Sequence, residues 1–523
     1  MYRVRDPLHG DVSLTQEEYR LINTYEMQRL SRVKQLGLSY LVYPGATHTR
    51  FEHSIGVRWL VENIIVKSKL PISPDKRRIL YLASLLHDVS HSCFSHRVEE
   101  SIRMIPSHEK IRDVILTGNI KEKLVDHKIL KSSEIENTKF ISDVLNRETI
   151  EEIRNVYDGT YQELKDILDN NIDADNLDYI LRDGFHLGLK AVDYDDRIYS
   201  AFRLGMDQTG RMRTVFANER TILESIEIIL NARWYLYRVA YLHHAIMIAD
   251  VMLSEAIRQW LNEENGDILF LVGDEELLSM LKGDNEVSRD CVNRLFSRRL
   301  YKRTYMLDHS SPLRAKQKAK DIRDNPVEKG EFENYVDEDI SIIFPRKDPW
   351  KEFGNILVDE DNPRPIKSEF YSEISLLKEK YDNLWRFLIA TPKEDYNTRK
   401  SIFDKCVKYF GDSGIYHPKE VLIKEKNSEL FEKLKTVLKK ITKEREASIR
   451  VLRELCGERE VMSGDIETKT GLSRSTVSQY LGYLRDILGE HDVPIISVRL
   501  DKKRKFWWIK DPRFREYILE STA

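Results

Sequence analysis

The sequence predicts a mainly α protein with an all-helical core, a small α+β lobe and a separate C-terminal module. Gly and Pro are scarce, with 22 and 15 among 523 residues, which favours helices over a turn-rich β protein. Apolar residues recur at helical spacing over long segments, among them residues 160–182 and 218–260. A chain of this length has room for about three domains.

We expect four segments along the chain. Residues 1–260 should form the helical core, and residues 261–415 the α+β lobe, where charged stretches alternate with strand-like runs such as 340–344. A Lys/Glu-rich stretch with an apolar stripe predicts a linker helix over residues 416–446. Residues 447–523 have the pattern of an independent small domain.

Composition excludes several classes of protein. The net charge of -3 excludes a uniformly basic coat for nucleic acid, so any polyanion must meet local patches. Four widely spaced cysteines without a CxxC motif favour a reducing, cytoplasmic location over a disulfide scaffold. No apolar run approaches the roughly 18 residues that span a bilayer, and the N-terminal residues lack a signal-peptide pattern. We therefore expect no membrane association.

The strongest chemical pattern is His87-Asp88 at the end of an apolar helix, because the two side chains can offer nitrogen and oxygen to one metal ion. Alone, such a pair is more typical of a capped helix with a surface carboxylate. His53 precedes it, and Asp175 lies in an acidic segment, residues 172–183, whose carboxylates cannot all be solvated on a core helix. The set therefore predicts a mixed nitrogen and oxygen site suited to Fe, Mn, Zn or Ni.

Seven motifs extend this pattern over the first half of the chain. They are residues 6–10, 28–30, 34–37, 43–57, 87–96, 107–109 and 172–183. On these motifs the chain resembles the HD-domain phosphohydrolases, specifically the SAM-and-HD-domain deoxynucleoside triphosphate triphosphohydrolases. The resemblance covers residues 1–260, weakens towards residue 410 and is absent beyond it, so the core is expected to be an all-helical HD domain.

The resemblance implies a metal centre and a reaction. The implied metal ligands are His53, His87, Asp88 and Asp175, and the implied catalytic residues are His91, His96, His108 and Glu109. The implied reaction is attack of water on the α-phosphorus of a deoxynucleoside triphosphate, which releases deoxynucleoside and inorganic triphosphate. His96 is expected to act as general acid or to orient the nucleophile, because the imidazole pKa lies near working pH. Mg²⁺ could accompany the substrate.

The resemblance also implies a substrate pocket. Its residues are Gln35, Leu36, Arg50, Tyr179, Asp183, Arg233, Tyr237 and Tyr241. Arg50 would hold phosphate, Gln35 and Leu36 would line the deoxyribose, and Asp183 would accept a hydrogen bond from the 3′-OH. Arg233 and Tyr241 would contact phosphate and base. From the residues alone, Arg50 and Arg233 could instead form ion pairs, and Tyr241 could be a core aromatic.

Some positions depart from the family pattern. Asn176, Tyr237 and His244 stand where members of the family usually have Lys, His and Lys. Asn23 and Ser31 stand where nucleotide-activated members have the Asp and Arg that fix guanine, so we expect no guanine-specific activation of that kind. The resemblance implies a homo-oligomer, a dimer or a tetramer.

The C-terminal segment reads as helix–turn–helix over residues 461–484, with Gly471 at the turn and Ser473 capping the second helix. A hairpin with a basic turn follows, and the whole resembles a winged helix-turn-helix. We predict that it contacts DNA or RNA through a set of polar and basic residues. They are Arg474, Ser475, Thr476, Gln479, Lys502, Lys503 and Arg504. The alternative is a protein-interaction module.

Three functions remain open from the sequence. The first is a metal-dependent deoxynucleoside triphosphate triphosphohydrolase with a nucleic-acid-binding or regulatory module. The second is an HD-type nuclease or phosphodiesterase that acts on DNA or RNA, since the same centre could cut a diester. The third is a transcriptional regulator whose HD domain binds a nucleotide as ligand, which the complete metal-ligand set disfavours.

Overall fold

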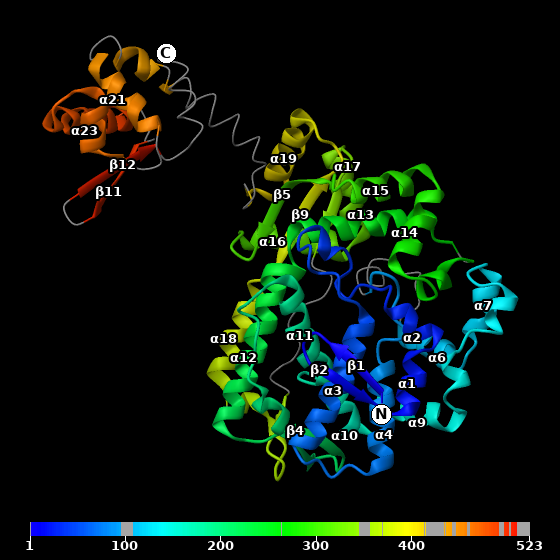
Figure 1. Ribbon diagram of the computed structural model, residues 1–523. Coiled ribbons are helices and arrows are strands. Elements are labelled where there is room, and N and C mark those ends of the chain that lie inside the picture. The colour runs from blue at the N-terminus through cyan, green and yellow to red at the C-terminus, as the bar shows by residue number, and fades with distance from the viewer. Residues whose placement is uncertain are drawn as a thin grey trace. The chain divides into compact units, whose positions relative to one another are not determined.

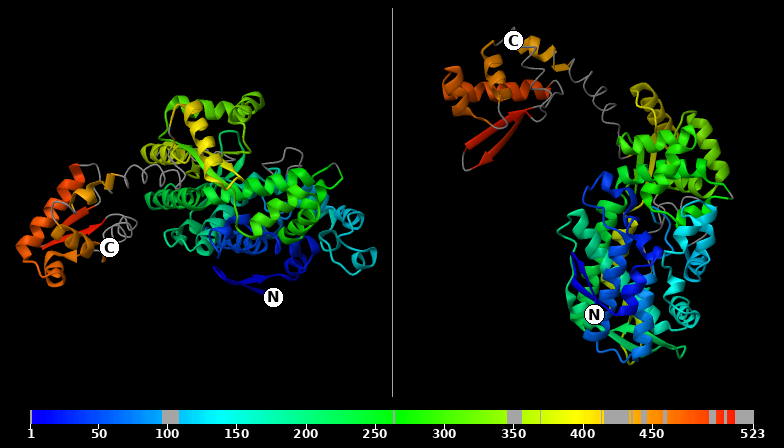
Figure 2. Two further views of the ribbon diagram at one scale, coloured as in Figure 1. Left: turned by 90° about the horizontal axis from the view of Figure 1, so that it is seen from above. Right: turned by 45° about the vertical axis from the view of Figure 1, so that its right-hand side comes forward.

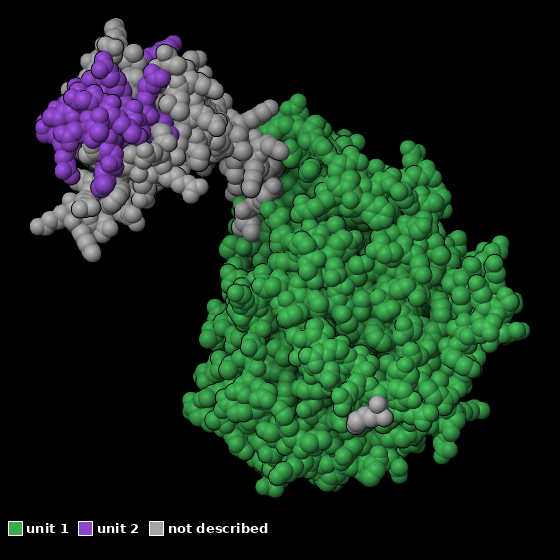
Figure 3. Space-filling view, viewed as in Figure 1, with its two compact units in different colours: residues 1–416 green, residues 417–523 purple. Residues whose placement is uncertain are grey.

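A computed structural model describes most of the chain as two compact units, residues 1–416 and 417–523 (Figure 3). The described residues are 2–95, 108–262, 264–344, 356–368, 370–412, 414, 433–434, 436–441, 446–457, 461–490, 496–501 and 504–509. They are mainly helical, which confirms the predicted fold class (Figure 1). The finer divisions at residues 260 and 446 stay predictions.

Helices dominate the first unit, which Figure 2 shows from two further directions. Those before residue 261 are α1 (Gln16–Ile22), α2 (Tyr25–Leu30), α3 (Arg50–Lys67), α4 (Pro74–Leu86), α6 (His108–Leu116), α7 (Ile120–Asp126), α8 (Ser132–Ile135), α9 (Arg147–Tyr157), α10 (Gln162–Leu168), α11 (Ala174–Leu187), α12 (Arg220–Leu236) and α13 (His244–Trp260). Those after it are α14 (Asp274–Gly283), α15 (Glu286–Phe296), α16 (Leu313–Asp324), α17 (Pro326–Val336), α18 (Tyr371–Asp382) and α19 (Tyr396–Phe410).

The helices that carry the candidate site begin at strong caps. Thr49 and Glu52 form a reciprocal capping box at the start of α3. Ser73 caps α4 ahead of a proline in the first turn, and the Asp173 side chain accepts from the backbone N–H of the third helical residue of α11. α11 ends at Gly188, whose φ of 70° is left-handed and suits glycine. These caps set where each helix begins or ends, and so fix the position of each site residue along its helix.

Two hairpins interrupt the region that the sequence predicts to be all-helical. β1 (Tyr2–Asp6) pairs antiparallel with β2 (Gly10–Leu14), and β3 (Phe202–Met206) pairs antiparallel with β4 (Met212–Phe216). They lie on either side of residues 50–183, whose described part contains helices, turns and loops but no strand. Each strand is only five residues long, too short for its alternation to stand out in the sequence.

Two small sheets include strands from the α+β lobe. β7 (Leu357–Val358) and β8 (Arg364–Pro365) extend the second hairpin in the order β3-β4-β7-β8. β5 (Lys302–Asp308), β9 (Arg386–Thr391) and β6 (Ser341–Ile343) form an antiparallel sheet in the order β5-β9-β6. The strand-like run predicted at 340–344 thus contains β6, one of the two edge strands.

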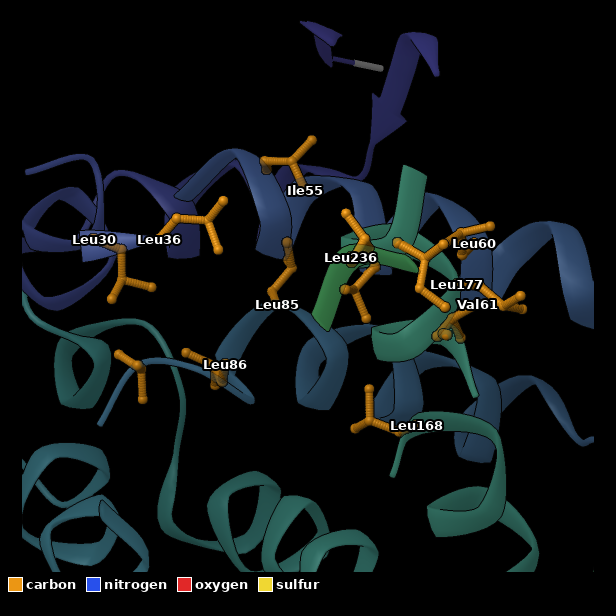
Figure 4. Close-up of a cluster of buried hydrophobic side chains, with 14 of the residues drawn as sticks. Leu30, Leu36, Ile55, Leu60, Val61, Leu85, Leu86, Leu168, Leu177 and Leu236 are labelled. Carbon is orange, nitrogen blue, oxygen red and sulfur yellow. The ribbon is translucent and has the colours of Figure 1, made fainter. Parts of the chain in front are cut away.

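A close-packed apolar layer lies between the helices that carry the site. Figure 4 shows Ile55 and Leu60 of α3, Leu85 of α4, Leu177 of α11 and Leu236 of α12 in this layer. All five are at most 1% exposed. Close-packed cores resist local movement. The four helices therefore hold the site residues at their ends in one arrangement.

The apolar segment 218–260 is not one helix. A π-helical turn at Tyr237–Tyr241 separates α12 from α13, and His243 caps α13. Such turns are rare, occur mostly inside α-helices and are frequent at functional sites. No Gly or Pro marks this break, so the sequence did not predict it.

The second unit contains helices and a three-stranded sheet. Its helices include α21 (Glu446–Gly457), α22 (Ser463–Thr470) and α23 (Arg474–Glu490). Its strands are β10 (Val461–Met462), β11 (Ile496–Asp501) and β12 (Arg504–Ile509), in the antiparallel order β10-β12-β11. Most of the linker helix expected over residues 416–446 falls outside the described residues. Across both units, the described helices include none that is long and apolar enough to cross a bilayer.

Candidate metal centre and substrate pocket

Four side chains from three helices converge at the ends of α4 and α11. His53 of α3 and the adjacent His87 and Asp88, which follow α4, place one ligand atom each within 4.8 Å of one another. Asp175 in the first turn of α11 brings its Oδ1 to 2.9 Å from His53 Nε2 and 4.0 Å from His87 Nε2. The structure therefore brings together all four predicted metal ligands.

Hydrogen bonds at the far side of each ring orient the two histidines. His53 Nδ1 lies 2.8 Å from Asp178 Oδ2, and His87 Nδ1 lies 2.8 Å from the backbone oxygen of Ser84. Each ring therefore turns its Nε2 atom towards the centre, where the two atoms are 3.3 Å apart. A carboxylate or carbonyl behind a ligating imidazole is the usual support of a protein metal site.

The donor set and its charges fit a divalent cation. Ligand atoms about 2.1 Å from one ion lie roughly 3 Å from each other, close to the spacing of the His53, His87 and Asp175 donors. Burial alone would lower the pKa of His53, but hydrogen bonds to Asp175 and Asp178 raise it to about 10. The surroundings thus favour positive charge at this point. Two imidazoles and two carboxylates suit Fe, Mn, Zn or Ni.

Asp88 is also contacted from outside the metal-ligand set. His91 Nε2 lies 3.1 Å from its Oδ1, and Arg50 Nη1 lies 2.5 Å from its Oδ2. Burial alone would raise the pKa of Asp88, but the charge of Arg50, followed by that of His87, holds it well below its usual range. Arg50 does form an ion pair, as one interpretation of the sequence allowed, and its partner is Asp88.

α11 presents a stripe of polar residues at helical spacing, Asp175, Tyr179 and Asp183. Asp183 Oδ1 lies 2.8 Å from His48 Nε2, and Tyr241 donates its hydroxyl to Asp183 Oδ2. The Tyr179 hydroxyl donates to Asn176 Oδ1 over 3.0 Å. The stripe therefore runs from the metal centre to the π-helical turn.

The π-helical turn adds aromatic rings beside Arg233. The Arg233 guanidinium lies over the Tyr237 ring, 5.3 Å from its centre, and the Tyr237 and Tyr241 rings meet edge to face at 5.0 Å. Burial raises the pKa of Tyr179 well above its usual range, and the nearby charge of Arg233 opposes this shift. Four predicted pocket residues are therefore neighbours. Tyr241 donates a hydrogen bond to Asp183, so it has a polar contact in addition to the packing expected of a core aromatic.

Gln35 and Leu36 lie beside His48. The backbone N–H of Gln35 donates to the His48 carbonyl over 3.0 Å, and Leu36 is buried. Gln35 Oε1 is also buried, and no donor for it exists among the residues that the structure describes. A buried acceptor of this kind is costly unless a ligand supplies the donor.

Sequence reasoning missed the side chains that support this site. Asp178 is fully buried, with Oδ1 2.7 Å from His9 Nε2 and Oδ2 2.7 Å from Arg182 Nε. Arg182 also donates to Asp6 over 2.9 Å. The spacing of Asp178 and Arg182, four residues apart on one helix, was the available sign of this ion pair. His48 gave no comparable pattern.

A second support holds the loop that follows Asp88. The guanidinium of Arg29 donates to the carbonyls of Val89 and His91, and the side chain of Asp274 accepts from the backbone N–H of Phe94 over 2.8 Å. Phe94 has a left-handed φ of 56°, an uncommon conformation for a bulky residue. The Arg29 side chain therefore holds the loop that contains His91 by bonding the backbone carbonyls of that loop.

Several predicted site residues cannot be placed. His96, Lys502 and Lys503 lie outside the described residues. His108 and Glu109 begin α6, and Arg504 begins β12, but their side chains also lie outside what the structure describes. The roles expected for these six residues stay predictions.

Comparison with known proteins agrees with this geometry. The HD domain family matches residues 50–183, and the HD associated region matches residues 213–411. The uncharacterized protein MJ1154 of Methanocaldococcus jannaschii is 30% identical over 75% of this chain and 79% of its own length. The chain belongs to the HD-domain family, which confirms the resemblance seen in the sequence.

Two further relatives bear on fold and activity. A crystal structure of a hypothetical protein from Aquifex aeolicus has a TM-score of 0.57 and 25% identity, covering 77% of this chain and 99% of that one. The deoxynucleoside triphosphate triphosphohydrolase SAMHD1 of Gallus gallus is 30% identical over 49% of this chain and 44% of that protein. The chain therefore spans less than half of that enzyme.

Proposed function

We propose that the protein is a metal-dependent hydrolase that converts deoxynucleoside triphosphates to deoxynucleoside and inorganic triphosphate. The observation that carries the proposal is that Asp175 belongs both to the group of donors around His53, His87 and Asp88 and to the polar stripe along α11. A metal site alone would suit many hydrolases, but the stripe adds hydrogen-bonding groups of the kind a sugar needs. The name of the SAMHD1 relatives supports the same substrate class.

At the centre, His53, His87, Asp88 and Asp175 would hold the ion. A bound divalent ion would supply Lewis acidity for attack of water at the α-phosphorus. Arg50, held on Asp88, places a fixed positive charge beside this point, where it would offset charge that develops on the phosphate. His91, His96 and His108, with Glu109, are proposed to move the protons of the reaction.

At the sugar end, Asp183 would accept a hydrogen bond from the 3′-OH. Its two oxygens already meet His48 and Tyr241, which fix the carboxylate in one orientation. The buried Oε1 of Gln35 is a second acceptor for a sugar hydroxyl. Leu36 would pack against the ring and leave no space for a 2′-OH.

At the phosphate end, this pocket has less positive charge than is usual in the family. Asn176, which stands in place of a Lys, donates to Asp173 Oδ2 over 2.7 Å and is thereby held within α11. Tyr237, which stands in place of a His, lies against Arg233. We therefore expect Mg²⁺ to accompany the triphosphate.

Product analysis tests the proposal. Purified protein would be incubated with Mn²⁺ or Mg²⁺ and each deoxynucleoside triphosphate, singly and mixed, beside single-stranded DNA and RNA. We expect deoxynucleoside and triphosphate from the native protein and none from the double variant His87→Ala/Asp88→Ala. The control His309→Ala removes an exposed histidine outside the site and should keep the activity. Intact nucleotides with shortened DNA or RNA would instead establish the nuclease alternative.

The homo-oligomer implied by the family remains part of the proposal. Light scattering coupled to size-exclusion chromatography, with and without nucleotide, would distinguish a dimer or tetramer from a monomer.

A further inference from the structure

The second unit carries an exposed polar helix face that hydrolysis at the HD centre does not use. One side of α23 is apolar and buried, and it includes Val477, Leu481 and Leu484. The opposite side is exposed in its first turns. Its exposed residues are Arg474, Ser475, Ser478 and Gln479.

A rigid turn sets the direction of α23. α22 ends at Gly471, whose φ of 70° is left-handed and whose N–H donates to the Glu467 carbonyl over 3.0 Å. Two residues later the Ser473 hydroxyl accepts from the backbone N–H of Thr476, which caps α23. Helix, short glycine turn and helix are the elements of a helix-turn-helix, in which the first turns of the second helix meet the ligand.

The two arginines on the outer surface of α23 differ in their partners. Arg485 donates twice to Asp486, over 2.8 and 2.6 Å. No acidic side chain lies within ion-pair distance of the Arg474 guanidinium among the described residues. The Glu467 carboxylate accepts from the backbone N–H of Arg474 over 3.1 Å, so it lies at the helix start, while the exposed guanidinium has no ion-pair partner among the described residues. The first turn of α23 therefore presents an arginine side chain beside hydroxyl and amide groups.

A glycine allows a close approach to the same face. Ser475, Gln479 and Gly482 follow one another at spacings of four and three residues, which places them in one row. A Cβ atom added at Gly482 would have nothing within 4 Å. Glycine inside a helix lowers stability relative to alanine. Gly482 therefore destabilises α23, and close contact with a ligand at this position would offset that loss.

The strands beside these helices point to the same class of ligand. β11 and β12 pair in register up to Asp501 and Arg504, so two residues connect them. In the sequence, residues 502–505 are all Lys or Arg. A basic hairpin next to a helix-turn-helix is an arrangement that contacts phosphates.

We propose that the second unit binds duplex DNA, with the first turns of α23 in the major groove. A helix with its side chains is about 10–12 Å across and fits the roughly 12 Å major groove of B-DNA, whereas the major groove of A-form RNA is too narrow. Arg474 suits guanine, and Gln479 suits adenine, through paired hydrogen bonds. Ser475 and Ser478 suit phosphate oxygens.

Fluorescence anisotropy of the whole protein with a labelled duplex of about 24 base pairs tests this proposal. EDTA in the buffer prevents cleavage, so binding is measured apart from any hydrolysis. We expect a dissociation constant on the order of 10⁻⁶ M at about 50 mM salt, weaker by at least about tenfold at about 200 mM. Absence of saturable binding, or tighter binding of double-stranded RNA or of single strands, would overturn the proposal.

Matched variants locate the contact. Arg474→Ala and Ser475→Glu should each weaken duplex binding by about fivefold or more, because the first removes a positive charge from the contact face and the second adds a negative one. Arg485→Ala removes the same side chain type from the same helix at a site already neutralised by Asp486, and should change binding by less than about twofold. Circular dichroism would confirm that each variant is folded. Equal losses for Arg474→Ala and Arg485→Ala would contradict the assigned face.

Discussion

Two buried carboxylates on α11, Asp178 and Asp183, stand in contrasting surroundings only five residues apart. We call the first group, Asp178 with His9, His53, Arg182 and Asp6, the Asp178 cluster. The second, Asp183 with His48 and Tyr241, is the Asp183 cluster. Both carboxylates are at most 2% exposed.

The clusters differ in how the carboxylate charge is compensated. Burial alone would raise the pKa of Asp178, but Arg182, with hydrogen bonds from His53 and His9, holds it well below its usual range. Asp183 has no arginine among the partners described for it, only an imidazole and a phenol. The lesson is that burial of an acid does not define its role. A fully paired acid supports the fold, whereas a lightly paired one keeps capacity for a ligand.

The largest predicted effect is on the Asp178 cluster. Asp178→Asn should lower the free energy of unfolding by about 3–5 kcal/mol, because Arg182 and the two histidines lose the buried anion that they share. Urea unfolding followed by circular dichroism measures this loss. A change below about 1 kcal/mol would show that the cluster is not a structural support.

A smaller loss is predicted for the glycine that faces the same cluster. A Cβ at Gly56 would lie 2.0 Å from Asp178 Oδ1 and 2.2 Å from Arg182 Nη2, so Gly56→Ala should cost about 1–3 kcal/mol. Gly330→Ala in α17 is the matched control, since nothing lies within 4 Å of the added atom. That change should stabilise by about 0.5–1 kcal/mol, the ordinary helix propensity. Thermal unfolding of both variants should show shifts of opposite sign.

A third buried acid, Glu26, extends the contrast between the two clusters to the pH dependence of stability. Glu26 accepts only backbone N–H groups among its described partners, and burial raises its pKa from 4.5 to about 8. Between these two values the unfolded chain releases a proton that the folded protein keeps, so stability falls as the pH rises. Glu26→Gln has no such proton. The free energy of unfolding of the variant minus that of the native protein should therefore increase by about 1–3 kcal/mol when the pH is raised from about 5 to about 8. An equal difference at both pH values would contradict the raised pKa.

The smallest effect on stability is predicted for the Asp183 cluster. In Asp183→Asn, His48 and Tyr241 keep a hydrogen-bonding partner of the same shape, so the free energy of unfolding should change by about 1 kcal/mol or less. On the proposed function, kcat/KM for a deoxynucleoside triphosphate should fall by about tenfold or more, since the 3′-OH loses a charged acceptor. Steady-state kinetics beside urea unfolding would separate the two effects. A variant that is unstable but fully active would reverse the contrast between the clusters.

Much of the metal centre was predictable because its signals are local. His87 and Asp88 are adjacent, and their position after an apolar helix is visible in the sequence. His53 and Asp175 follow from family motifs. Arg50 was expected on phosphate, but its position on Asp88 depends on how α3 packs against the end of α4, which no short motif encodes.

The helical fold class, the adjacent His87-Asp88 pair and the Ser473 cap could be predicted from the amino-acid sequence, because they depend on composition, periodicity and neighbours within a few residues. Three features depend on the packed fold. They are the pairing of the acids on α11, the place of Tyr237 and Tyr241 at the π-helical turn, and the hold of Arg29 and Asp274 on the loop that contains His91. These features join residues that lie up to 180 positions apart, as Phe94 and Asp274 do. The energy of such contacts depends on burial and geometry that exist only once the helices have packed.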